Sequence, residues 1–142
     1  MYVLYVATRR LGPLFEKQEI AVMRSVKMAP PNSLLFVSDV DGGQAPLPVL
    51  GAQILATGSC LSIACYPWID GETTVTLGPS SEVDPGTPPA FDGELETPSR
   101  TIVISTVDQK TVLSDNVAGT KTRVRAWVNR PSMPDQVVIG FE

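Results

Sequence analysis

The sequence contains no histidine among its 142 residues. Histidine is the side chain that changes charge near neutral pH, and it activates the nucleophile in Ser-His and Cys-His pairs. It is also a ligand in almost every catalytic zinc site. Carboxylate pairs and lysines can still catalyse reactions without it. The absence nevertheless argues against an enzyme, and we predict no catalytic residues, no metal ligands and no cofactor.

Cysteine is scarce, and its spacing does not match any common cysteine motif. The two cysteines, Cys60 and Cys65, lie in the apolar run 59–66. In an extended strand they would be roughly 16 Å apart on opposite faces, which is too far for a disulfide bond. Their spacing also differs from the CxxC pattern of zinc ribbons and redox motifs. We therefore expect two unbonded thiols, at least one of them buried, in a reducing compartment.

Long apolar runs are absent as well. No stretch approaches the ~20 apolar residues that a membrane-spanning helix needs. Residues 2–7 are apolar, but Arg9 and Arg10 follow them, whereas a signal peptide has its positive charges first. We expect a protein without a membrane partner, located in the cytoplasm or assembled from the cytoplasm into a larger particle.

Positive charge is missing from the middle of the chain. There is no lysine or arginine between Lys27 and Arg100, although the net charge is only −4. The acidic residues of that stretch are Asp39, Asp41, Asp70, Glu72, Glu82, Asp84, Asp92, Glu94 and Glu96. The segregation has two interpretations, namely chance combined with cross-strand ion pairs, or a charge polarity used for association. In either case an acidic chain is a poor candidate for binding nucleic acid.

Proline and glycine are abundant, which favours short strands over long helices. The 13 prolines and 11 glycines are spread along the chain, and neither residue suits the interior of a helix. Apolar alternation separated by turn residues predicts an all-β fold, a single antiparallel β-sandwich or jelly-roll-like domain of about eight short strands over residues 1–142. Residues 14–28 fit a helical stripe or a strand, and we favour the strand. Residues 78–98 are predicted to be a long, mainly irregular, proline-rich surface loop, either solvated or used for docking.

Two sequence motifs resemble known sites but lack essential parts. Residues 119–122 resemble the end of a phosphate-binding loop, yet Lys121 opens a predicted strand and not the helix that such a loop requires. Residues 39–42 suggest a calcium loop, but Leu50 occupies the position of the bidentate glutamate. Both segments are more typical of turns than of ligand sites.

The clearest pattern is the alternation in residues 121–129. Thr122, Val124, Ala126 and Val128 should share one face of a strand, and the opposite face should carry Lys121, Arg123, Arg125, Trp127 and Asn129. One interpretation is a half-buried strand with a basic outer face, in which arginine stems cover the tryptophan. The other is an exposed ribbon that binds a partner, because arginine and tryptophan carry much interface energy. We predict Lys121, Arg123, Arg125 and Trp127 as partner-binding residues, facing the acidic 39–96 region of another copy.

These observations favour a non-catalytic structural or protein-binding domain that docks onto other copies or onto a larger assembly, for example a viral or phage particle. Two other functions are compatible with the residues. An acidic inhibitor or immunity-type protein would use the lysine-free middle to cap a basic enzyme such as a nuclease. A carbohydrate- or calcium-binding sandwich module would use the acidic turns around Asp41, Asp70 and Asp92.

Overall fold

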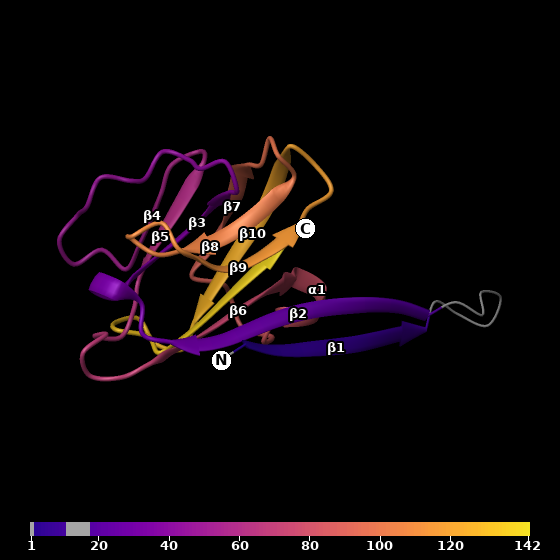
Figure 1. The fold of residues 1–142 in the computed structure, drawn as a ribbon, viewed down its shortest axis with the longest axis horizontal. Coiled ribbons are helices and arrows are strands. Elements are labelled where there is room, and N and C mark those ends of the chain that lie inside the picture. Colours follow the sequence, from indigo (N-terminus) through magenta and orange to yellow (C-terminus); the bar gives the residue numbers. More distant parts are fainter. Residues whose placement is uncertain (1, 11–17) are drawn as a thin grey trace.

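The structure is a computed structural model that describes the backbone of residues 2–10 and 18–142, and the side chains from Arg24 onward. Its strands are β1 (Tyr2–Arg10), β2 (Gln18–Met28), β3 (Leu34–Asp39), β4 (Ile54–Ala56), β5 (Cys60–Ala64), β6 (Thr73–Pro79), β7 (Phe91–Glu96), β8 (Thr101–Ser105), β9 (Thr111–Asn116), β10 (Lys121–Val128) and β11 (Gln136–Phe141). The helical turns are α1 (Ser80–Val83) and a 3₁₀ turn (Pro31–Ser33). The predicted predominance of strands is therefore confirmed, and β2 is the strand that we favoured over a helix (Figure 1).

The strands form two open sheets. The six-stranded sheet has the order β1-β2-β6-β11-β10-β7, and the five-stranded sheet has the order β4-β5-β3-β8-β9. Every pairing is antiparallel except that of β6 with β11, which is parallel. Eleven strands are described where about eight were predicted, and the parallel pair departs from a purely antiparallel arrangement. Neither feature is visible in local alternation, because pairing partners are set by distant parts of the chain.

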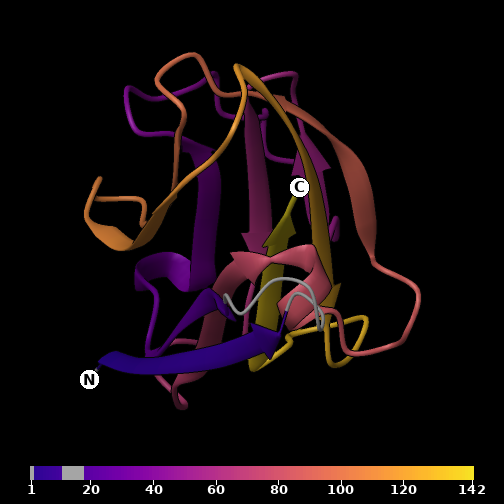
Figure 2. The same cartoon turned by 90° about the vertical axis from the view of Figure 1, so that its right-hand side faces the viewer.

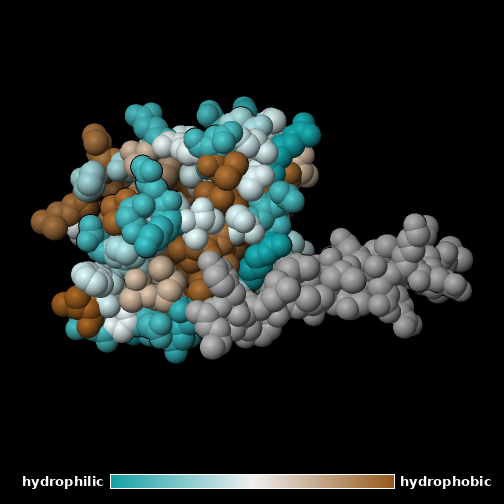
Figure 3. Space-filling model, in the orientation of Figure 1, coloured by the Kyte–Doolittle hydropathy of each residue, from teal (hydrophilic) through white to brown (hydrophobic). Residues whose placement is uncertain are grey.

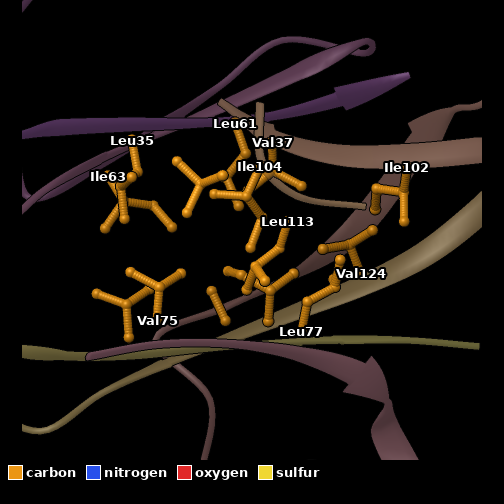
Figure 4. Close-up of a cluster of buried hydrophobic side chains, with 14 of the residues drawn as sticks. Leu35, Val37, Leu61, Ile63, Val75, Leu77, Ile102, Ile104, Leu113 and Val124 are labelled. Carbon is orange, nitrogen blue, oxygen red and sulfur yellow. The ribbon is translucent and has the colours of Figure 1, made fainter. Parts of the chain in front are cut away.

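The core takes side chains from both sheets. Leu35, Val37 and Ile63 come from the five-stranded sheet, and Val75 and Leu77 come from the six-stranded sheet (Figure 4). All five are completely buried. Alternate residues of each strand point to the same face, so the apolar positions of neighbouring strands meet in one layer. Burying each such side chain contributes about 1.5–3 kcal/mol.

The predicted long loop at 78–98 is only partly irregular, so this prediction was wrong. The segment contains the end of β6, all of α1 and all of β7, which pairs antiparallel with β10. The β7 sequence alternates inward Leu95 with the outward carboxylates Asp92 and Glu94. The prolines on either side of β7 made the segment resemble a loop in the sequence. They do not disturb the strand, because they lie outside its paired residues.

Candidate functional site

The basic face of β10 has the alternation that the sequence predicts. Thr122, Val124 and Ala126 are buried, whereas Lys121 and Arg123 are exposed. The neighbouring strand β7 places its acidic residues opposite these cations, since Lys121 faces Glu96 and Arg123 faces Glu94. Opposite charges in directly facing positions stabilise a pair of strands modestly.

The arginines of this face bind carboxylates of their own chain. Arg123 donates from Nε and Nη2 to the two carboxylate oxygens of Asp92, at 2.9 and 2.7 Å. Arg125 places Nη2 3.0 Å from Glu142 Oε1 and Nε 3.6 Å from Asp92 Oδ2. The hydrogen bonds from Arg123, with the positive charges of both arginines, hold the pKa of Asp92 below its usual range. The arginines therefore do bind a carboxylate from residues 39–96, as expected, but this carboxylate, Asp92, belongs to the same chain and not to another copy.

Trp127 does not belong to an exposed ribbon, and this part of the prediction was wrong. Only 3% of its surface is exposed, and its Nε1 donates a hydrogen bond of 2.8 Å to the carbonyl oxygen of Thr87. α1, which precedes Thr87 in the chain, lies against β11, the neighbour of β10 (Figure 2). No local pattern could show this contact, because the segment that covers the indole lies 40 residues earlier in the chain.

Partner binding by the four predicted residues therefore stays a prediction, and fewer of the four are accessible to a partner than we expected. Lys121 and Arg123 remain exposed, Arg125 is half-buried and Trp127 is internal. Surface ion pairs of this kind are weak, so a partner could still compete for Arg123. The structure brings the three cations to one face, and it separates Trp127 from solvent.

A cavity of about 480 Å³ lies on the five-stranded sheet, lined by β3 and β8 together with the segments that follow them. Its lining includes Phe36, Val103, Cys60 and Asp39. Burial raises the pKa of the Cys60 thiol to about 11, so the thiol stays protonated and is a poor nucleophile near neutral pH. The Asp39 carboxylate accepts the backbone N–H groups of Asp41 and Ser99 at 3.0 and 2.9 Å. These two groups thus have structural roles in the cavity wall.

Among the side chains that the structure describes, the thiols and the acidic residues show no arrangement typical of a metal site. Cys60 and Cys65 are free and buried, which confirms the prediction that they are not bonded to each other. Among the described residues, no group of three histidine, cysteine, aspartate or glutamate side chains lies close enough to hold a metal ion. In the same part of the chain, none of the helices is long and apolar enough to cross a membrane.

The largest feature that sequence reasoning missed is a hairpin, formed by β1 and β2, that extends beyond its own sheet. β1 pairs with β2 along its whole length, from Tyr2 opposite Val26 to Arg10 opposite Gln18. β2 pairs with β6 only from Arg24 to Met28. The remaining pairs, Tyr5 opposite Met23 and outward to the hairpin end, therefore have no third strand, and they project from the body (Figure 1). We call β1 residues 5–10 and β2 residues 18–23 the arm.

An exposed apolar surface lies on the body. Residues 42–69 contain no charged residue. Within them, Leu47 is 85% exposed and Ile69 is 77% exposed, and Val49, Leu50 and Trp68 are exposed as well. In Figure 3, brown side chains project at the left-hand end of the body, and in Figure 1, drawn in the same orientation, the arm points to the right. Exposed apolar loops of this kind are typical of contact surfaces.

Comparison with known proteins finds no matching family model, no matching curated protein and no matching solved structure.

Proposed function

We propose that the chain is a non-catalytic structural protein whose two sheets are the layers of a β-sandwich, and that it assembles with other copies of itself through the arm. Such assembly suits a larger particle, of which a viral or phage particle is one example. The observation that carries the proposal is the hairpin register, in which residues 18–23 of β2 pair with β1 and pairing with β6 begins only at Arg24.

The sequence of the arm supports an interface. The even-numbered register positions place Val6 opposite Val22 and Thr8 opposite Ile20, and the odd-numbered positions place Tyr5 opposite Met23. Facing residues of an antiparallel pair lie on the same side, so both faces of the arm carry apolar residues. A two-stranded hairpin is at best marginally stable in water, whereas a third strand or a covered face stabilises it. Contact with another copy would supply that cover.

The acidic-inhibitor alternative has less support, because the acidic residues of the middle do not act as one free surface. Asp39 is 1% exposed and its carboxylate is hydrogen bonded to backbone groups. Asp92 is bound to Arg123. The remaining carboxylates are distributed among turns, the helix α1 and the strand β7, in different parts of the fold.

Sedimentation velocity of the full chain over a range of concentrations tests the proposal. We expect reversible association that weakens in Val22→Ser, because this change removes an apolar side chain from the arm. The matched control is Val107→Ser, which changes an exposed valine on the body. Association that weakens equally in both variants, or a chain that stays monomeric at every concentration, would contradict assembly through the arm.

A further inference from the structure

The two sheets have four edge strands, and three of them are protected against pairing. The edges are β1 and β7 in the six-stranded sheet, and β4 and β9 in the five-stranded sheet. An edge strand presents unpaired N–H and C=O groups that can pair with another chain. Proteins protect such edges with short strands, charged side chains, bulges or covering segments.

The edges β4, β7 and β9 each carry a recognised protection. β4 has only three residues. β7 carries the outward carboxylates Asp92, Glu94 and Glu96, and the Glu96 N–H already donates to Gly58 O at 2.9 Å. β9 has an irregular register with β8 at Ser105, and its Asp115 forms a 2.7 Å ion pair with Arg24 of β2.

β1 is the exception. It has nine residues, contains no proline and carries no charge before Arg9. In the described part of the chain no strand pairs with its outer side. A long edge strand whose charges are confined to one end readily adds a further strand.

We infer that β1 pairs antiparallel with β1 of a second copy, with the two Val6 residues facing each other across a two-fold axis; this inference rests on the proposed function. The register is the one that pairs all nine residues of both strands. It places Tyr2 opposite Arg10, Val3 opposite Arg9, Leu4 opposite Thr8 and Tyr5 opposite Ala7. The two arms then form one four-stranded antiparallel sheet in the order β2-β1-β1-β2.

The strand is suited to pairing with its own copy for two reasons. A two-fold contact brings the same residues of both chains together, so like charges must not face each other. In this register each arginine faces an uncharged residue, and the four arginines lie at the two ends of the paired strands. β7 of another copy is a poorer partner, because it is shorter and its Asp92 carboxylate already interacts with Arg123 and Arg125.

Cysteine crosslinking tests this register. In Val6→Cys the two new thiols would face each other with Cβ atoms about 4.5–5.5 Å apart, near enough for a disulfide after small adjustment. In the control Val3→Cys each new thiol would face Arg9, and the two thiols would be roughly 20 Å apart. Cys60 and Cys65 are buried, with pKa values raised to about 11 and 12, so the native chain serves as an unreactive baseline.

Under mild oxidation we expect Val6→Cys to form a covalent dimer on the order of a hundredfold faster than Val3→Cys, because pairing raises the effective concentration of the thiols. Under reducing conditions both variants should sediment as the native chain does. If Val6→Cys and Val3→Cys crosslink at equal rates in a chain that still associates, the β1 pairing is wrong, whereas the proposed assembly is not contradicted. A chain that is monomeric and crosslinks in neither variant would overturn both.

Discussion

The two halves of β2 have different surroundings. From Arg24 to Val26 the strand pairs with β1 on one side and with β6 on the other, and Val26 is 5% exposed and belongs to the core. From Gln18 to Met23 it pairs only with β1. Both halves contain apolar residues at alternate positions. Alternation therefore specifies a strand, but it does not say whether the same chain or another one covers its apolar face.

The body and the arm thus differ in what supplies their stability. In the body, residues such as Leu77 and Ile104 are buried by other strands of the same chain. In the arm, we propose that a second copy of the chain covers the apolar residues. Changes in the body should affect unfolding of a single chain, and changes in the arm should affect association.

The largest expected effect is that of a truncation in the core. Leu77→Ala should lower the free energy of unfolding by about 2–5 kcal/mol, because Leu77 is completely buried and its loss leaves a cavity. Val22→Ala in the arm should lower it by no more than about 0.5 kcal/mol in dilute protein, where chains are separate. Urea denaturation at low concentration measures both. Similar losses in the two variants would show that the arm is part of the core.

The outer face of the six-stranded sheet should respond less strongly. A Cβ at Gly140 would lie 2.6 Å from Ser80 Oγ and 2.9 Å from Trp127 Cζ3, so Gly140→Ala should cost about 1–3 kcal/mol through overpacking. Gly58→Ala is the matched control, since the nearest neighbour of its Cβ would be 4.0 Å away, and its effect should stay within about 0.5 kcal/mol. Thermal or urea unfolding distinguishes them. An unchanged Gly140→Ala protein would mean that α1 does not pack closely over Trp127.

The smallest expected effect concerns the ion pair on the β10 face. Replacing Arg123 by Gln should raise the pKa of Asp92, because the hydrogen bond from Arg123 is the main cause of its lowered value. Arg125→Gln should raise it less, since Arg125 acts only through its charge. A carboxylate pKa lowered by folding stabilises the protein above the unfolded pKa, and this contribution disappears as the pH falls through the folded value. NMR titration of the Asp92 carboxyl carbon measures the shift, and equal responses to the two substitutions would contradict this assignment.

Local sequence patterns predicted the elements better than their partners. The buried positions Val124 and Ala126 and the exposed Arg123 followed from alternation alone. The cover over Trp127 did not, because it depends on Ser80 and Thr87, which are distant in the sequence. β7 was missed because its outward residues are acidic and its neighbours are prolines.

The arm could not be predicted for a related reason. The sequence showed an apolar run at residues 2–7 and a segment at residues 14–28 that fits a helix or a strand. How far the two strands extend past β6 depends on where pairing of β2 with β6 begins, at Arg24, and no local pattern marks that point. Alternation shows which residues share a face, but it does not show where a neighbouring strand ends.

Hydrogen exchange of β1 at two protein concentrations tests the central claim most directly. Amides on the outer side of β1 should be exposed in the single chain and hydrogen bonded when a second copy pairs with it. We predict that β1 amides exchange more slowly at high concentration, while amides of β8 (Thr101–Ser105), which is paired on both sides, are unaffected. Exchange of β1 at the same rate at both concentrations, in a chain that sedimentation shows to be associated, would contradict the account.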